Sequence, residues 1–257
     1  MGAHGGKVAV VTGGAKGIGR GCVERFVRDG ANVVIADVDV DAARALEREL
    51  GPAAYAVRCD VTDEASVQAM IEATVQRFGG VDYAVNNAGI IMVSPLVDTD
   101  YARWKRLMDV NVNGIFLTAR ATARQMIRQG RGGVIVNGSS GAGRHGVPNF
   151  SHYCASKAAI IMLSQALAQE LAPHRIRVNC YTPGHIETPL WNDIADGFAK
   201  AKGLTREQVI ASFLEGVPWG RFGRPADVAN AVSWLCTDEA EYVSGQCIAM
   251  NGAQLPW

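Results

Sequence analysis

Short apolar runs alternate along the chain with longer segments whose apolar residues recur every three or four positions. The runs are rich in Val, Ile and Ala and lack polar alternation, which is typical of strands buried on both faces of a parallel sheet. The sequence therefore predicts seven strands, at residues 7–12, 32–37, 53–59, 82–88, 133–139, 175–181 and 246–252.

The longer segments predict helices between these strands. In the first of them Ile18, Cys22 and Phe26 follow one another at fourfold spacing, and Gly30 is a suitable C-terminal stop. This alternation predicts an α/β protein, a single Rossmann-type doubly wound domain over residues 1–257 with a seven-stranded parallel sheet flanked by helices. The predicted helices lie at residues 17–29, 39–50, 63–78, 100–129, 151–172 and 205–216.

One region departs from this alternation. Residues 182–204 show no clear period and lie between a predicted strand and a predicted helix. A loop of that length in a compact domain usually serves a function. We therefore expect a substrate lid at about residues 185–215.

The bulk composition excludes several classes of function. Of the 257 residues 48% are hydrophobic, enough for a substantial core, and 25 basic residues balance 25 acidic ones. A neutral chain lacks the charge of a general nucleic-acid binder. Because there is no run of 18 apolar residues and no secretory segment, we expect no membrane span. Six scattered cysteines without C-x-x-C spacing predict reduced thiols in a cytoplasmic protein and no metal site.

A glycine-rich loop, TGGAKGIG at residues 12–19, joins the first predicted strand to the first helix. Gly13, Gly17 and Gly19 leave backbone amides free to approach a pyrophosphate at a helix N-terminus, where the dipole is positive. Asp37 ends the next strand 18 residues past Gly19, the place expected for a carboxylate on the ribose 2′-hydroxyl of NAD. The alternative role of Asp37 is the N-cap of the following helix.

The choice of cofactor follows from charge. A carboxylate at Asp37 repels a 2′-phosphate, and Val38 offers no cation to compensate. Lys16 favours the opposite choice, NADP(H), because a lysine in the glycine loop could pair with a 2′-phosphate. The alternative role of Lys16 is that of a solvated loop residue. Two charges a few ångströms apart interact by about 1 to 4 kcal/mol. We expect Asp37 to be the nearer and more buried of the two, so the sequence predicts NAD(H).

Further motifs follow the glycine loop in a fixed order. They are NNAG at 86–89, Asn111 within MDVNVNGIF, Ser140 placed 13 residues before Tyr153, the Tyr-x-x-x-Lys arrangement of Tyr153 and Lys157, and the Pro-Gly turn of RVNCYTPGHIETP at 177–189. With these motifs the chain resembles the short-chain dehydrogenase/reductase family over nearly its full length.

The chain departs from the family pattern near its C-terminus. Asn251-Gly252-Ala253 stands where the family more often has Asp-Gly-Gly. This departure bears on the oligomer contact or on the end of the substrate pocket. His152 and Cys154, on either side of Tyr153, are also unusual, and they either shape the pocket or pack behind it.

The resemblance implies which residues hold NAD(H). Asp60 and Val61 would flank the adenine, although DVTDEA is also a good start for the next helix. The complete implied set is Gly13, Lys16, Gly17, Ile18, Gly19, Asp37, Val38, Asp60, Val61, Asn87, Ala88, Gly89, Tyr153, Lys157, Pro183, Gly184, Ile186 and Thr188.

The resemblance also implies catalytic roles for Asn111, Ser140, Tyr153 and Lys157. Tyr153 would be the general acid or base; its ordinary pKa is near 10. Lys157, one helical turn away, is placed to lower that pKa toward the working pH. Ser140 would hold the substrate oxygen, and Asn111 would interrupt its helix and hold a water that links Lys157 to solvent. The simpler alternatives are a turn cap at Ser140, with Ser139 as its rival, and an ordinary polar helix residue at Asn111.

The predicted function is that of an NAD(H)-dependent oxidoreductase that interconverts a secondary alcohol, diol or polyol and its ketone. The alternatives are an NADPH-dependent 3-oxoacyl reductase, which Asp37 disfavours, a nucleotide-sugar epimerase, whose glycine spacing differs, and an NAD-binding sensor or scaffold, which needs no complete catalytic set. The predicted substrate residues are Gly141, His145, Asn149, His185 and Trp191, with Ala142 and Phe198 as further candidates.

Family resemblance also implies a homotetramer. The helices at 100–129 and 151–172 would form one dimer face, and Trp257 would reach a neighbouring subunit.

Overall fold

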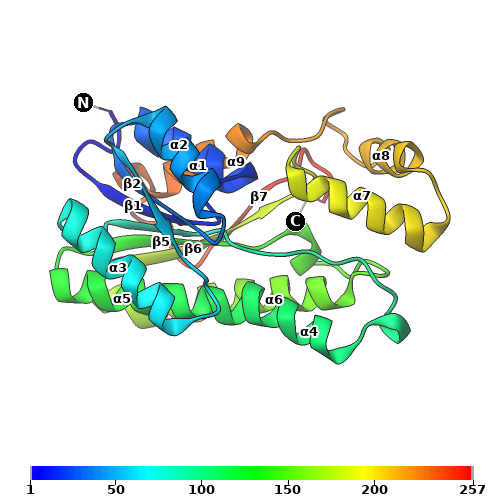
Figure 1. The fold of residues 1–257 in the computed structure, drawn as a ribbon, viewed down its shortest axis with the longest axis horizontal. Helices are drawn as coiled ribbons and strands as arrows, with labels where there is room; N and C mark the ends of the chain where they lie inside the picture. Colours follow the sequence, from blue (N-terminus) through cyan, green and yellow to red (C-terminus); the bar gives the residue numbers. More distant parts are fainter. Residues whose placement is uncertain (1, 256–257) are drawn as a thin grey trace.

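The computed structural model describes residues 2–255, and within them seven parallel strands form one sheet in the order β3-β2-β1-β4-β5-β6-β7 (Figure 1). Trp257, for which a subunit contact was predicted, lies outside the described residues. The strand order reverses between β1 and β4, and ligands of such sheets bind beyond the carboxyl ends of the strands at this point. The strands are β1 (Val8–Thr12), β2 (Asn32–Asp37), β3 (Ala54–Arg58), β4 (Tyr83–Asn86), β5 (Gly133–Gly138), β6 (Ile176–Pro183) and β7 (Cys247–Met250).

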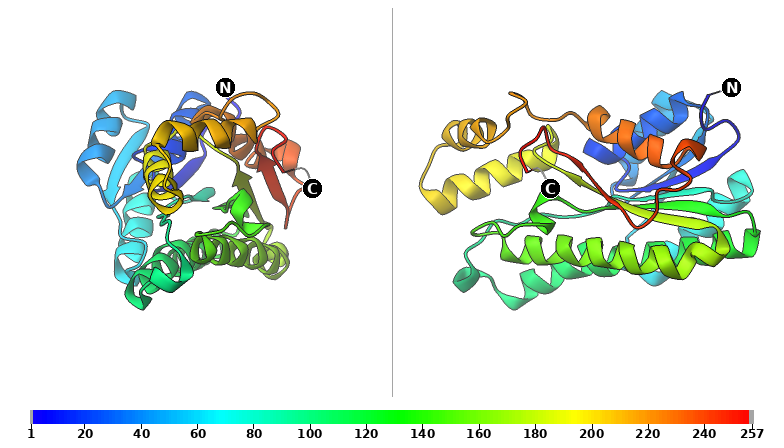
Figure 2. Two further views of the ribbon diagram at one scale, coloured as in Figure 1. Left: turned by 90° about the vertical axis from the view of Figure 1, so that its right-hand side faces the viewer. Right: turned by 180° about the vertical axis from the view of Figure 1, so that it is seen from behind.

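Helices cover both faces of the sheet (Figures 1 and 2). One layer holds α1 (Gly17–Arg28), α2 (Val40–Leu50) and α9 (Pro225–Leu235), and the other holds α3 (Glu64–Phe78), α5 (Gly114–Gln129) and α6 (Ser151–Leu171). Successive side chains of β2 lie on opposite faces of the sheet. Val33 belongs to the hydrophobic cluster on the side of α1 and α9, and Val34 belongs to the cluster on the side of α3 and α5. The predicted doubly wound fold is confirmed.

Three further helices lie at the carboxyl end of the sheet: α4 (Tyr101–Met108), α7 (Pro189–Lys202) and α8 (Arg206–Glu215). The prediction of a loop without regular structure at 182–204 is wrong, because α7 occupies most of this range. Pro189 lies in the first turn, where its missing N–H costs nothing, and Trp191, Ala195 and Phe198 are buried on one face. α9 has no counterpart among the predicted elements.

The helix predicted over 100–129 is interrupted. A π-type turn over Asp109–Asn113 separates α4 from α5, so one additional residue is accommodated in the helical path. Such turns are frequent at functional sites, and this one contains Asn111.

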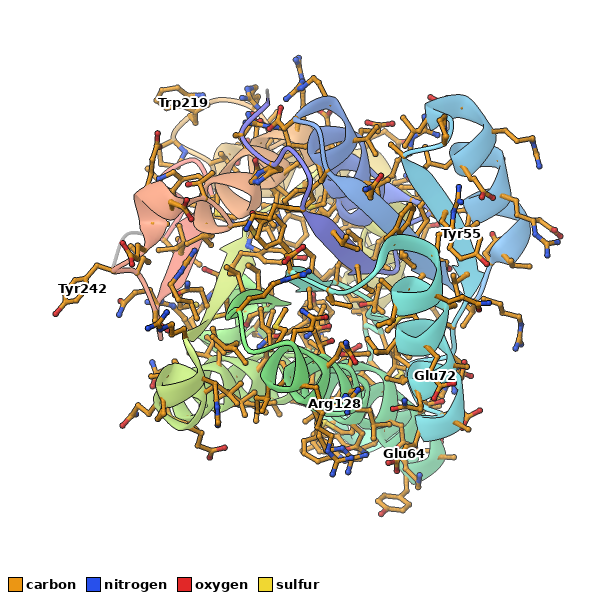
Figure 3. The ribbon with its side chains drawn as sticks, turned by 90° about the vertical axis from the view of Figure 1, so that its left-hand side faces the viewer. Tyr55, Glu64, Glu72, Arg128, Trp219 and Tyr242 are labelled. Atoms are coloured by element: carbon orange, nitrogen blue, oxygen red, sulfur yellow. The ribbon has the colours of Figure 1, made fainter. Side chains whose placement is uncertain are left out.

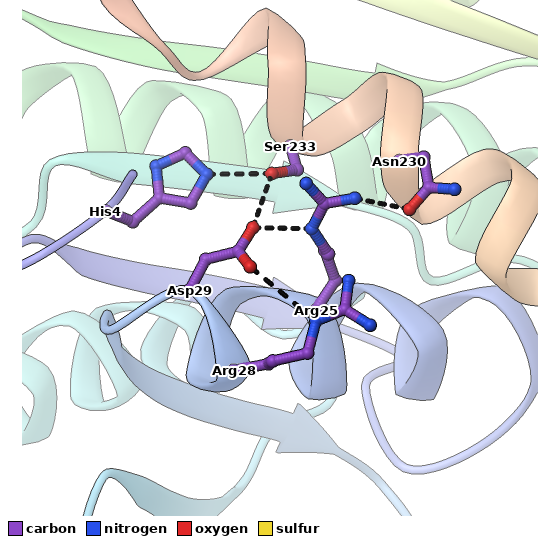
Figure 4. Close-up of polar contacts among 6 residues, drawn as sticks. All are labelled: His4, Arg25, Arg28, Asp29, Asn230 and Ser233. Carbon is purple, nitrogen blue, oxygen red and sulfur yellow. Dashed lines mark hydrogen bonds and ion pairs between the residues drawn. The ribbon is translucent and has the colours of Figure 1, made fainter. Parts of the chain in front are cut away.

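A polar cluster fixes the N-terminal segment against two helices (Figure 4). The buried His4 ring lies with Nε2 2.8 Å from Ser233 Oγ on α9. Ser233 in turn contacts the Asp29 carboxylate at the end of α1, which also pairs with Arg25 at 2.5 Å. Arg25 completes the cluster through a hydrogen bond to Asn230. The cluster therefore connects residue 4 to both α1 and α9, and burial lowers the pKa of His4.

All six cysteines are free thiols, four of them buried and the other two, Cys154 and Cys247, half-buried. Within residues 2–255 no helix is long and apolar enough to cross a membrane.

Candidate functional site

Two cavities meet beyond the carboxyl ends of the strands. The glycine-loop cavity, of about 570 Å³, extends from Gly13 past Asp37 to Thr188. The tyrosine cavity, of about 260 Å³, contains Tyr153 and Ser140. Ile18, Thr188 and Leu190 line both. A ligand that fills the first cavity can therefore present one end to the second.

The glycines are required by close contacts in the loop. Gly13 and Gly17 have φ of +61° and +54°, in the left-handed region where side chains are disfavoured. A Cβ on Gly19 would lie 2.0 Å from the Gly13 carbonyl oxygen. Lys16, the N-cap of α1, makes no capping bond with its side chain. The first-turn amides are therefore available to an anion, as a pyrophosphate requires.

Asp37 ends β2 and contacts the glycine loop with its carboxylate. Oδ2 accepts from the Ala15 amide at 3.0 Å, and Oδ1 accepts from the Asp39 amide at 3.0 Å. Asp39, not Asp37, caps α2. The N-cap alternative for Asp37 is therefore wrong.

The lysine of the glycine loop is paired. Lys16 Nζ lies 2.6 Å from Asp39 Oδ2, and both side chains are exposed. The loop and the end of β2 together therefore carry two carboxylates, those of Asp37 and Asp39, against one ammonium group.

The motif after β4 holds the glycine loop in place. Asn87 Nδ2 donates to the carbonyls of Thr12 and Gly13, both at 3.1 Å, and its Oδ1 accepts from the Tyr181 hydroxyl at 2.8 Å. Asn87, Ala88 and Gly89, which are predicted to contact the cofactor, all line the glycine-loop cavity. The Tyr181 contact gave no signal in the sequence, because it joins residues 94 positions apart.

Asp60 and Val61 also line this cavity. Asp60 Oδ1 accepts from Thr62 through both its amide and its hydroxyl, while Asp63 caps α3. Asp60 is therefore not the helix cap that the alternative proposed. The predicted cofactor set missed eight other lining residues: Cys59, Ile90, Arg106, Val110, Pro189, Leu190, Asn192 and Asp193.

Tyr153 lies on the first turns of α6 and is only 9% exposed. Burial raises the pKa of Tyr153 to about 12, and a hydrogen bond with Ser140 opposes this increase. Lys157 Nζ lies 5.5 Å from the tyrosine ring centroid and donates to the Gly138 carbonyl at 2.9 Å. Burial lowers the pKa of Lys157 to about 8. The expected lowering of the tyrosine pKa is thus not found, because burial outweighs any effect of Lys157 here.

The two serines after β5 have different environments. Ser139 is buried, and its hydroxyl donates to the Lys157 carbonyl oxygen at 2.7 Å. Ser140 Oγ accepts from the Ala142 amide at 3.2 Å, so the hydroxyl proton remains for another acceptor. Ser140 lines the tyrosine cavity, whereas Ser139 does not. The geometry therefore favours Ser140 over its rival, although Ser140 is also a turn cap.

Asn111 is fully buried in the π-type turn. Its Oδ1 accepts from the Ile90 amide at 2.8 Å, and its Nδ2 donates to the Ile90 carbonyl at 3.0 Å and to Ser156 Oγ at 3.2 Å. The side chain therefore connects the segment after β4 to α6. The water predicted at Asn111 stays a prediction.

Most of the predicted substrate residues line the tyrosine cavity: Gly141, Ala142, His145, His185, Trp191 and Phe198. The prediction that Asn149 lines the substrate pocket is wrong, because Asn149 does not line the tyrosine cavity. Its backbone has φ of 64°, and its carbonyl accepts from the Ser94 amide at 2.9 Å. It shapes the chain before α6 instead. The sequence missed Ile91, Val147, Phe213, Gln254 and Leu255 as wall residues.

The unusual neighbours of Tyr153 pack behind the cavity. His152 is fully buried, and its Nε2 lies 2.7 Å from the Met92 carbonyl oxygen. Cys154 is half-buried and packs against the hydrophobic cluster around Phe150. Neither residue lines the tyrosine cavity.

Comparisons with known proteins agree with this arrangement. The family model described as enoyl-(acyl carrier protein) reductase matches residues 13–252. The sorbitol dehydrogenase of Cereibacter sphaeroides is 40% identical over 247 residues, 96% of each chain. Two solved structures are each 36% identical in sequence to this chain. One is a short-chain type dehydrogenase/reductase from Mycobacterium marinum, with a TM-score of 0.90, and the match covers 98% of this chain and 96% of that one. The other is a 3-ketoacyl-(acyl-carrier-protein) reductase from Brucella melitensis complexed with NADH, with a TM-score of 0.88, and the match covers 97% of this chain and 98% of that one. The chain therefore belongs to the short-chain dehydrogenase/reductase family of oxidoreductases, which act on CH–OH groups with a nicotinamide cofactor.

Proposed function

We propose that the protein is an NAD(H)-dependent oxidoreductase that interconverts a secondary alcohol, such as a diol or polyol, and its ketone. The observation that carries this proposal is the junction of the two cavities at Ile18 and Thr188, with the Ser140 and Tyr153 hydroxyls in the second cavity. The similarity to a sorbitol dehydrogenase supports an alcohol substrate.

The residues present fit a dinucleotide. The backbone at Gly13, Gly17 and Gly19 would hold the pyrophosphate, and Asp37 would bind the adenosine ribose. When bound, the nicotinamide supplies or accepts the hydride. The excess of carboxylate over ammonium at Asp37, Asp39 and Lys16 supports NAD(H) over NADP(H), because a 2′-phosphate would meet net negative charge.

In the direction of oxidation the substrate loses a hydride from carbon to NAD⁺ and a proton from oxygen, which gives a ketone, NADH and H⁺. Ser140 would donate to the substrate oxygen, and Tyr153 in its phenolate form would take up the proton; in the direction of reduction the Tyr153 phenol would return that proton to the oxygen. Lys157, whose side chain lies one helical turn from Tyr153, would orient the nicotinamide ribose. Asn111 would hold the segment at Ile90 in register with α6.

The second candidate is a 3-oxoacyl reductase. It is favoured by the similarity to the Brucella melitensis reductase, whose structure contains NADH. Against it stands the tyrosine cavity of about 260 Å³, which is small for an acyl chain on a carrier. A cofactor-binding sensor or scaffold would not need the Ser140–Tyr153 pair in a cavity that joins the glycine-loop cavity.

Several broader features belong to the same proposal. We propose a single domain with α7 and α8 as the substrate lid, a cytoplasmic location and a homotetramer. Exposed apolar side chains support assembly: Phe116 on α5 is 45% exposed and Met162 on α6 is 65% exposed. Trp219 and Tyr242 also point outward from another side of the molecule (Figure 3).

The function is tested by following NADH formation with the purified full chain and a panel of secondary alcohols, diols and polyols. We expect turnover with NAD⁺ on at least one alcohol, and oxidation of NADH with the matching ketone. Absence of turnover in both directions with both NAD(H) and NADP(H), in a protein that still binds NADH, would support the sensor alternative. Turnover of 3-oxoacyl thioesters alone would support the second candidate.

The two serines offer a matched pair of variants. We expect Ser140→Ala to lower kcat by about 10²-fold, because it removes a hydrogen-bond donor to the oxygen that gains charge. Ser139→Ala should affect stability more than chemistry, since it removes a buried hydrogen bond to the Lys157 carbonyl worth about 1 kcal/mol. Steady-state kinetics and thermal unfolding of both variants separate the two effects. The reverse pattern would assign the substrate contact to Ser139.

A further inference from the structure

The tyrosine cavity has a largely apolar wall with two pairs of polar side chains on it. One pair is Ser140 and Tyr153, and the other is His185 and Gln254; Thr188 lies where this cavity meets the glycine-loop cavity. His145 also lines the cavity, but it is exposed and its Nδ1 lies 2.9 Å from the Gly141 carbonyl oxygen. The apolar lining is Ile91, Val147, Phe150, Leu190, Trp191, Ile194, Phe198, Phe213 and Leu255.

A turn after β7 brings Gln254 into this wall. The Gln254 amide donates to the Asn251 carbonyl at 3.1 Å, and the Gly252 carbonyl accepts from the Trp219 amide at 3.2 Å. The turn lies directly on Gly184, where a Cβ would be 2.9 Å from Asn251 and 3.1 Å from Gln254 Oε1. The departure of the sequence from Asp-Gly-Gly therefore coincides with a turn that ends the pocket.

His185 is held by aromatic rings and by Gln254. Its ring centroid lies 4.7 Å from that of Phe213 and 4.9 Å from that of Trp191. Gln254 Nε2 lies 2.7 Å from His185 Nε2. Burial lowers the pKa of His185 to about 4, with a smaller contribution from His145, so the ring is neutral at pH 7.

A neutral imidazole beside an amide carries both donors and acceptors, which suits a hydroxyl or ketone oxygen. Among the described residues no Lys or Arg lines the tyrosine cavity. A substrate with a carboxylate or phosphate would therefore find no opposite charge there, and burying an unpaired charge is costly.

Size and wall chemistry limit the substrate further. The cavity of about 260 Å³ lies just below the usual range for small-ligand sites, about 300 to 1,000 Å³. A linear hexitol would press several hydroxyls against Phe150, Phe198 and Phe213, and a buried hydroxyl without a hydrogen-bond partner disfavours binding. A small carbon ring presents apolar faces to these side chains and needs polar partners only for its oxygens.

We propose that the preferred substrate is a compact, uncharged cyclic alcohol with a second oxygen, that is, a cyclic diol or hydroxyketone. Its reacting oxygen lies at Ser140 and Tyr153, and its second oxygen bonds to His185 and Gln254. This proposal rests on the proposed function and narrows its substrate class.

The test compares kcat/KM for NAD⁺-coupled oxidation of cyclohexanol, the 1,2-, 1,3- and 1,4-cyclohexanediols and sorbitol. We expect the best diol to exceed cyclohexanol by about tenfold or more, because one net hydrogen bond contributes about 1.4 kcal/mol. We expect sorbitol to be poorer than the best diol. In Gln254→Leu and His185→Phe the ratio of diol to cyclohexanol should fall toward one.

The matched control is Gln246→Leu, because Gln246 is exposed and does not line the cavity. It should keep the wild-type ratio. His185→Phe retains an aromatic ring in the cluster, and thermal unfolding checks that each variant is folded. Equal kcat/KM values for cyclohexanol and all three diols, a higher value for sorbitol, or an unchanged ratio in folded Gln254→Leu would overturn the proposal. Failure of every alcohol and ketone with either cofactor would reject the proposed function, and this inference with it.

Discussion

Tyr153→Phe should lower kcat by about 10³-fold while NADH binding is kept. The variant removes the one hydroxyl in the tyrosine cavity that is positioned with Ser140 to exchange a proton with the substrate oxygen. General acid–base catalysis contributes about 10² to 10⁴ in rate, so the loss is of that order. Steady-state kinetics measure kcat, and NADH fluorescence titration measures binding.

Tyr55→Phe is the matched control for this variant. Tyr55 lies on β3, away from both cavities, and packs against Phe78 (Figure 3). It should retain wild-type turnover, because the same oxygen atom is deleted at a site without chemistry. A Tyr153→Phe protein that is folded and turns over at the wild-type rate would exclude Tyr153 as the proton donor.

Wild-type protein should prefer NAD⁺ to NADP⁺, and Asp37→Asn should shift the ratio of their kcat/KM values toward NADP⁺ by about 10²-fold. The variant removes a negative charge close to the expected 2′-phosphate, an interaction of about 1 to 4 kcal/mol. It also disturbs one of the two hydrogen bonds that the carboxylate accepts from Ala15 and Asp39. Both cofactors therefore lose some affinity, and the ratio is the informative quantity.

Asp41→Asn is the control for charge alone, since Asp41 is exposed in the first turn of α2. It should leave the ratio unchanged. A wild-type preference for NADP⁺ would show that Lys16 dominates the ribose site in spite of its pairing with Asp39.

The parts of the fold that depend on residues close together in the sequence were predictable from it. The apolar run at Val33 to Ala36 is a buried strand, and the glycine motif follows β1 and opens α1, as predicted. α7 was missed although its signal is local. Trp191, Ala195 and Phe198 repeat at helical spacing, and Thr188-Pro189 is a typical helix start, so local signals for this helix were present.

Other features depend on contacts between distant segments. The π-type turn is coupled to bonds between Asn111 and residues 21 and 45 positions away. Gln254 reaches the pocket because its turn is bonded to Trp219 and packed on Gly184. The raised pKa of Tyr153 follows from burial, which a spacing of four residues from Lys157 does not reveal.

The turn that carries Gln254 and Leu255 has a consequence for protein engineering. It lies at the end of the chain, after the last strand, and it is joined to the rest of the wall by packing and a few hydrogen bonds. We expect changes in its length or composition to alter substrate selectivity and to leave the sheet and α6 intact. A library randomised at Gln254 and Leu255 would therefore change the wall of the tyrosine cavity without a change in the core.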